Sequence, residues 1–182
     1  MEGKKRMVKK AKRSAEKVEL IKVSAARLEE FLEGRVIFNK SIDSNGVTVF
    51  RGILGGYKGQ YDNFRFKILV SSWCVVSYAY LPFMVKQDKR NLVAELITRI
   101  NWCVKVGHFD LNFKTGEVRF KSEWPMIALD EASKDPESGI SKRIVYQPSK
   151  MVHDWAEVID LVTQRQCNVE KLFARTLEKL VK

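Results

Sequence analysis

The sequence contains few of the residues from which metal centres, disulfide frameworks and thiol active sites are built. Its 182 residues include three cysteines and two histidines, which are Cys74, Cys103, Cys167, His108 and His153. None of them forms a CxxC or HxxxH pair, so the sequence predicts no metal site and no bound cofactor. The odd number and wide spacing of the cysteines argue against a disulfide framework and favour a reducing compartment.

The sequence also lacks the signatures of common active sites. Cys103 is expected at the edge of a helical core stripe, while Cys74 and Cys167 have no histidine nearby in the sequence to act as a base. The carboxylates are scattered, without the short spacing of an acid/base pair or of a divalent-metal cluster. The glycines of segment 52–59 match neither GxxxxGK[ST] nor GxGxxG. We therefore expect a protein that is not an enzyme.

Acidic residues are scarce near the N-terminus. The formal net charge of the chain is +11, and residues 1–17 contribute +6 of it, because eight Lys or Arg accompany only two Glu. This basic arm can bind phosphates or an anionic membrane surface through charge alone, or it can be the solvated start of a helix. It contains no apolar stretch of the kind that a secretory signal requires, which predicts a cytoplasmic protein.

One uncharged segment, residues 68–85, approaches the length of about 20 residues that a membrane-spanning helix needs. Its serines and tyrosines dilute the hydrophobicity, Pro82 would interrupt a helix, and β-branched and aromatic residues dominate. We therefore expect strands in this segment, and no transmembrane segment.

Apolar residues at helical spacing predict helices over residues 14–33 and 88–104, with Asp88 as the N-cap of the second. A final helical region is expected to begin with Pro148 at its first position. It contains two apolar stripes with no glycine or proline between them. Either one long helix or two helices joined at Asn168 would fit this pattern.

Turn residues between apolar runs predict hairpins. Asn45-Gly46 indicates a hairpin with a bulge or a longer loop, because a simple two-residue turn would place Lys40 opposite Arg51. A turn at Ser71-Ser72 would place Val70 opposite Trp73, with one face of the pair apolar throughout.

A turn at Thr115-Gly116 would place Phe113 opposite Val118 on an apolar face. In the same register His108 lies opposite Glu123 on the polar face. A surface histidine paired with a carboxylate is expected there rather than a metal ligand.

The order of these elements predicts an α+β fold, in which helices cover a mostly antiparallel sheet. We expect a basic N-terminal arm over residues 1–17 and an α+β domain over residues 18–147. Residues 148–182 are expected to form a C-terminal helical region that packs on this domain or on a partner.

The unit formed by the second helix and the following hairpin carries a pattern of turn and core residues: Asn101, Gly107, Phe109, Gly116, Val118 and Phe120. With this pattern, residues 35–125 resemble the YbjN family of bacterial proteins, described as putative sensory transduction regulators. The resemblance implies a fold like that of type III secretion chaperones, a homodimer, and protein binding rather than catalysis. It implies no catalytic residues.

Two functions follow from these patterns. The first is a non-enzymatic, chaperone-like domain that binds another protein through an exposed apolar helix stripe. The residues proposed for this contact are Trp155, Val158 and Val162, or Phe173 and Leu177. The alternative for each stripe is that it packs on the sheet.

The second function is association with a nucleic acid. Aromatic and basic residues interleave in segment 57–67, as they do on single-strand binding surfaces, while strand alternation sends Phe64 and Phe66 to the core. The residues left for the contact are Tyr57, Lys58, Tyr61, Arg65 and Lys67, together with Lys4, Lys5, Arg6, Lys9, Lys10, Lys12 and Arg13 of the basic arm.

Overall fold

Six antiparallel strands form one sheet in the order β1-β2-β3-β4-β6-β5. The computed structural model of the protein describes residues 2–55, 60–126 and 139–181. The strands are β1 (Ile37–Ile42), β2 (Thr48–Leu54), β3 (Phe64–Val70), β4 (Cys74–Met84), β5 (His108–Leu111) and β6 (Glu117–Pro125). The helical elements are α1 (Glu2–Leu32), η1 (Gln87–Lys89), α2 (Arg90–Cys103), α4 (Gly139–Gln164) and α5 (Val169–Val181). The predicted α+β class is confirmed.

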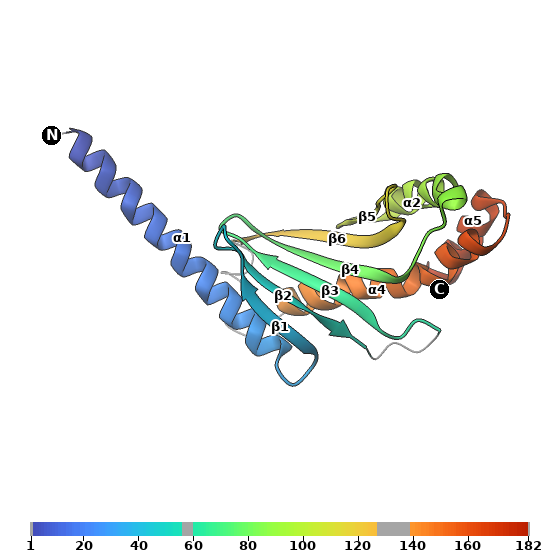
Figure 1. The fold of residues 1–182 in the computed structure, drawn as a ribbon, viewed down its shortest axis with the longest axis horizontal. Helices are drawn as coiled ribbons and strands as arrows, with labels where there is room; N and C mark the ends of the chain where they lie inside the picture. The colour runs from blue at the N-terminus through green and yellow to red at the C-terminus, as the bar shows by residue number, and fades with distance from the viewer. Residues whose placement is uncertain (1, 56–59, 127–138, 182) are drawn as a thin grey trace.

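The sheet has one buried and one open face, because its strands alternate apolar and polar residues. In β3, Phe64, Phe66, Ile68 and Val70 are buried, whereas Arg65 and Lys67 point the other way. Helix α4 runs along the buried face behind β3, β4 and β6, and the N-terminal half of α1 extends well beyond the sheet (Figure 1). The helices therefore pack on the side to which these apolar residues point.

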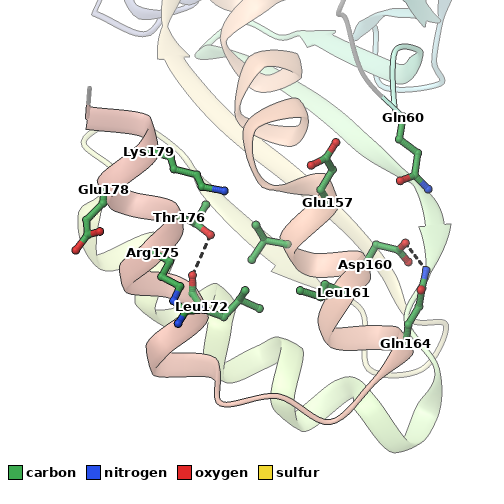
Figure 2. Close-up of a pocket in the computed structure, with 11 residues that line it drawn as sticks. Gln60, Glu157, Asp160, Leu161, Gln164, Leu172, Arg175, Thr176, Glu178 and Lys179 are labelled. Carbon is green, nitrogen blue, oxygen red and sulfur yellow. Dashed lines mark hydrogen bonds between the residues drawn. The ribbon is translucent and has the colours of Figure 1, made fainter.

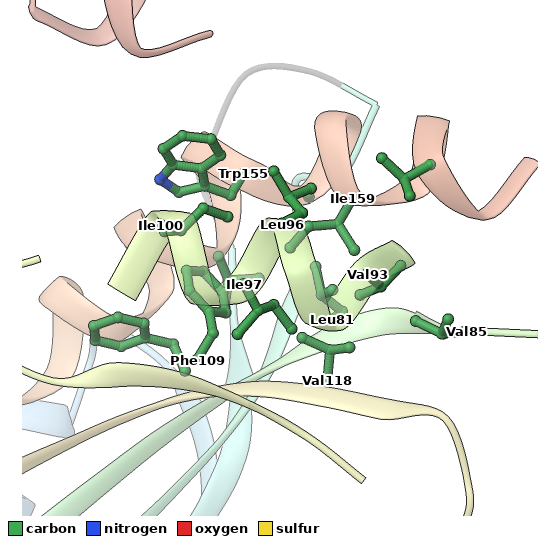
Figure 3. Close-up of a cluster of buried hydrophobic side chains, with 14 of the residues drawn as sticks. Leu81, Val85, Val93, Leu96, Ile97, Ile100, Phe109, Val118, Trp155 and Ile159 are labelled. Atoms are coloured by element: carbon green, nitrogen blue, oxygen red, sulfur yellow. The ribbon is translucent and has the colours of Figure 1, made fainter. Parts of the chain in front are cut away.

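Two apolar clusters fill the space between sheet and helices. In the first, Leu81, Phe109 and Val118 of the sheet meet Leu96 and Ile100 of α2, with Trp155 and Ile159 of α4 above them (Figure 3). The second joins the C-terminal half of α1 to the other end of the sheet. It includes Leu28, Phe31, Phe50, Phe66, Ile68 and Ile144.

Segment 68–85, which the sequence predicts to be strands, forms the end of β3 and the whole of β4. None of the helices in the described parts of the chain is long and apolar enough to cross a membrane.

The first hairpin has the longer loop that the sequence predicts. The Asp43 carboxylate accepts hydrogen bonds from the amides of Asn45 and Val47 at 2.9 and 3.0 Å, and Gly46 has a φ of +76°. The resulting three-residue loop places Arg51 opposite Asn39 rather than Lys40. The unfavourable Lys40–Arg51 pair is thereby avoided.

The registers predicted for the other two hairpins are wrong by two residues. Val70 lies opposite Val75, and Val118 lies opposite Leu111, so Trp73 and Phe113 fall in turns and are exposed. In the second case the Asn112 side chain accepts hydrogen bonds from the amides of Lys114 and Thr115 and holds a four-residue loop. A shift of two residues preserves both faces of a strand, so the apolar pattern cannot detect it.

Three predicted helix ends differ from the structure. Asp88 lies in η1 and does not cap α2, which begins at Arg90. Helix α4 begins at Gly139, so Pro148 lies inside it and is buried. Helix α1 begins at Glu2 rather than near Ser14. The C-terminal region is two helices, and the Asn168 side chain accepts a hydrogen bond from the Lys171 amide at 2.9 Å, which caps α5.

Candidate functional site

The sheet face that none of the described helices covers gathers cations and tyrosines from four strands. Cross-strand pairing aligns Arg51, Lys67, Tyr78 and Lys121 in one row and Arg65, Tyr80 and Arg119 in the next. We call this surface the open face. Because every second residue of a strand points to the same side, the alternation that buries Phe64, Phe66 and Ile68 also presents these polar residues together.

The charges of the open face are unevenly balanced. Its five cations face three carboxylates, Asp110, Glu117 and Glu123, all on β5 and β6. Arg119 Nε lies 3.0 Å from Asp110, Lys121 pairs with Glu123, and Arg65 lies 3.5 Å from Glu117. The negative charge is therefore confined to one half of the face.

The β2–β3 half of the face carries uncompensated positive charge. Arg51 and Lys67 are directly opposite each other, and neither has a carboxylate partner among the described residues. Arg51 donates a hydrogen bond to the Ser41 hydroxyl at 3.1 Å instead. Like charges directly across a strand pair are destabilising, so this arrangement favours an anion bound above it.

Two tyrosines stand at the centre of the face, on β4. The rings of Tyr78 and Tyr80 are 6.3 Å apart, and both are half-buried. The guanidinium of Arg119 lies 4.6 Å from the Tyr78 ring and that of Arg65 5.3 Å from the Tyr80 ring. Burial, more than any charge nearby, raises the pKa of Tyr80, so its phenol is neutral at physiological pH.

Asp110 ties Arg119 to the neighbouring histidine. His108 Nε2 lies 3.2 Å from Asp110, so the predicted partner Glu123 is wrong, although the expected pairing with a carboxylate holds. Burial alone would lower the pKa of Arg119, but the hydrogen bond and charge of Asp110 outweigh it and raise that pKa. Arg119 is thus a fixed cation, whereas Arg65, whose side chain is 60% exposed, has only the longer contact with Glu117 among the carboxylates of the described chain.

The residues predicted for nucleic-acid binding divide into three groups. Arg65 and Lys67 lie on the open face. Tyr61 does not, because its hydroxyl donates a 2.6 Å hydrogen bond to Asp160 of α4 and its ring packs against Phe83. Tyr57 and Lys58 lie outside the described residues. The basic arm is the first part of helix α1, whose side chains over residues 1–14 also lie outside the description.

Sequence reasoning missed five members of the open face, which are Arg51, Tyr78, Tyr80, Arg119 and Lys121. Part of the open face can be predicted from the polar positions of β3 and β4, because buried and less buried residues alternate along both strands. The pairing of β4 with β6 is not visible in the sequence, since the two strands are separated by η1, α2 and β5.

The residues predicted for protein binding are mostly turned inward. Trp155 and Val162 are buried, and the Trp155 ring stacks on Phe173 at 5.8 Å between centroids. Val158, Phe173 and Leu177 are half-buried. The prediction that Trp155 and Val162 lie on an exposed contact surface is therefore wrong, because both side chains pack in the core beneath α5.

A cleft of about 770 Å³ opens between α4 and α5 (Figure 2). Leu161 and Leu172 line it together with Val158, while Glu157, Arg175 and Lys179 stand at its rim. Asp160 on its wall is occupied, since it accepts hydrogen bonds from Tyr61 and Gln164. The cleft is thus lined by three apolar side chains among polar and charged ones of both signs.

Within residues 2–55, 60–126 and 139–181, no three potential ligand side chains of His, Cys, Asp or Glu converge on a point where a metal could bind. The three cysteines are free thiols, with Cys103 exposed and the other two half-buried.

The fold and this surface define an α+β protein whose sheet has one helix-covered and one open, cationic face. Comparison of the chain with protein-family models and with curated proteins finds no match. Membership of the YbjN family therefore stays a prediction from the sequence.

Proposed function

We propose that the protein binds a nucleic acid on the open face of its sheet. The observation that carries this proposal is the pair Arg51 and Lys67. They are opposite each other, have no carboxylate partner in the described chain, and lie beside two half-buried tyrosines. Cations supply the sequence-independent attraction to phosphates, and aromatic rings supply stacking surfaces for bases. Both requirements meet on this face.

The surplus of positive charge supports a polyanionic ligand over a protein ligand. The whole chain has a formal net charge of +11, and the basic arm precedes the body of the protein in helix α1. Helix α1 reaches beyond the sheet, so it offers a second place for phosphate contacts (Figure 1). The arm adds affinity to the open face through charge.

Protein binding, the first function predicted from the sequence, ranks second. It is supported by the three apolar side chains that line the α4–α5 cleft, because Val158, Leu161 and Leu172 are each half-buried rather than buried. Two of its five predicted contact residues lie in the core, whereas the open face gathers its cations at the surface. Because of this contrast, we place nucleic-acid binding before protein binding, the reverse of the order expected from the sequence.

The predicted homodimer remains a separate proposal. Its best contact is the edge strand β1, where Ile37 is 85% and Ile42 70% exposed. Exposed apolar edge strands pair readily with another strand. Light scattering of the wild-type chain and of Ile37→Lys tests this proposal. A wild-type chain that stays monomeric at high concentration would contradict it.

The test of nucleic-acid binding is fluorescence anisotropy of a labelled oligonucleotide at low salt, using the full-length chain. Each phosphate contact adds about 0.7 to the slope of log affinity against log salt on a single strand. The double variant Arg51→Gln/Lys67→Gln should weaken binding and reduce that slope by about 1.4.

The matched control removes two positive charges from the helix-covered side, in Arg99→Gln/Lys150→Gln on α2 and α4. This control should bind like the wild type. Equal affinities for the control and for Arg51→Gln/Lys67→Gln would overturn the open face as the site. Deletion of residues 1–13 then measures how much of the binding the basic arm supplies.

A further inference from the structure

We infer that the open face selects single strands by seating two successive unpaired bases on Tyr80 and Tyr78. This inference rests on the proposed function and specifies the class of nucleic acid. The ring centroids are 6.3 Å apart, whereas successive stacked bases in a duplex are separated by about 3.4 Å. Two bases can lie on these rings only if they are unstacked from each other, which a duplex does not permit.

The cations indicate where the sugar-phosphate chain runs. On the β6 side of the tyrosines, Arg119 and Lys121 are each paired with a carboxylate. On the β3 side, Lys67 lies one strand from Tyr78 and Arg51 lies two, at spacings of about 4.8 Å per strand. The phosphates are therefore expected over β2 and β3, with the bases pointing toward β4.

Arg65 links the base site to the phosphate site. Its guanidinium covers the Tyr80 ring at 5.3 Å, but its side chain is 60% exposed and its only carboxylate contact in the described chain is 3.5 Å long. A base that stacks on Tyr80 takes the place of this guanidinium. The released Arg65 can then pair with a phosphate over β3, so one movement creates both contacts.

The guanidinium over the Tyr78 ring is held more firmly than the one over the Tyr80 ring. Arg119, which lies over the Tyr78 ring, is held by Asp110 at 3.0 Å and has a side chain that is only 37% exposed. Because guanidinium planes also stack on bases, Arg119 can stay in place as part of the platform. Tyr80 is accordingly the residue whose loss should affect single-strand binding most.

The experiment compares Tyr80→Ala and Tyr80→Phe with the wild type on oligouridylate, oligothymidylate and a DNA duplex, by anisotropy. Base stacking on an aromatic side chain is equivalent to an affinity loss of roughly 5- to 150-fold on alanine substitution. We expect Tyr80→Ala to lose affinity in this range for both single strands and little for the duplex, while Tyr80→Phe stays near the wild type. Unequal losses on the two single strands would identify RNA or DNA as the preferred source.

Tyr80→Leu keeps apolar volume at the site and serves if Tyr80→Ala fails to fold; it should show the same loss of affinity. The control is Trp102→Ala, which removes an aromatic ring that is 91% exposed and lies on α2, away from the open face. Equal wild-type affinity for duplex and single strand, with Tyr80→Leu unchanged, would overturn the inference and leave nucleic-acid binding standing. No binding of any of the three ligands by the wild type would overturn the proposed function itself.

Discussion

Arg51 of β2 and Lys67 of β3 are directly opposite each other on the open face, and neither has a carboxylate partner in the described chain. A fold that needed only stability would place opposite charges there. Residues kept at some cost to stability are common at binding sites. We therefore attribute this pair to ligand binding rather than to the stability of the sheet.

Lys67→Glu should stabilise the protein while weakening nucleic-acid binding. The substitution turns a repulsive cross-strand pair into an attractive one, worth about 0.2–1 kcal/mol in the free energy of unfolding. Urea denaturation measures the gain, and anisotropy measures the loss of binding. Lys150→Glu, an equal charge change on α4, should leave binding unchanged and should not raise stability, because it replaces the i,i+4 ion pair with Asp154 by a like-charge pair. A Lys67→Glu variant less stable than the wild type would show that the Arg51–Lys67 pair is not repulsive.

Gly116→Ala should destabilise the protein more than Gly46→Ala. Both glycines have positive φ, +80° and +76°, so alanine suffers similar backbone strain of about 1 kcal/mol at each. A Cβ at position 116 would also lie 2.2 Å from the Val85 carbonyl oxygen, whereas one at position 46 meets nothing within 4 Å. Equal losses of unfolding free energy would mean that the close approach to Val85 is not required.

Tyr61→Phe should cost about 1 kcal/mol of unfolding free energy, because it removes the hydrogen bond that ties the start of β3 to Asp160 of α4. Burial and Asp160 raise the pKa of Tyr61 from 10.0 to about 12. The folded state thus favours the neutral phenol, and this stabilisation is complete below pH 10 and lost between pH 10 and 12. Denaturation across that range should bring wild type and Tyr61→Phe closer together; a constant gap would contradict the hydrogen bond.

Trp155→Ala should cost about 3–5 kcal/mol, since the ring is buried against Phe173 and its loss leaves a cavity. Trp102→Ala, which removes a ring that is 91% exposed, should change stability by no more than about 0.5 kcal/mol. Thermal or urea unfolding compares the two. A small effect of Trp155→Ala would return Trp155 to the list of contact residues.

The sequence predicts which segments are strands and which face of each strand is buried, because side-chain alternation records both. It does not determine register, since Ser71 and Asn112 set the turn positions through side chains that accept hydrogen bonds from backbone amides, and Ser71 also donates one to the Cys74 carbonyl. A register error of two residues leaves the residues that remain in the strands on their predicted faces, while Trp73 and Phe113 move into exposed turns. The buried half of the fold is therefore predictable, whereas the turn positions of the β3–β4 and β5–β6 hairpins are not.

The open face could be predicted only in part for the same reason. Arg65 and Lys67 follow from the alternation of β3, and they were among the residues predicted to bind a nucleic acid. Arg119 and Lys121 join them through the pairing of β4 with β6, which connects strands far apart in the chain. Pairing between strands so far apart in the chain depends on the whole fold and leaves no local pattern in the sequence.

Binding of a nucleic acid on the open face is tested most directly by the affinity of the full-length protein for a labelled oligothymidylate, measured across a salt series for the wild type and for Arg51→Gln/Lys67→Gln. Binding by the wild type should be salt-sensitive, and the variant should bind more weakly with a salt slope smaller by about 1.4. Identical slopes and affinities for the two proteins, or no binding by the wild type at low salt, would contradict it.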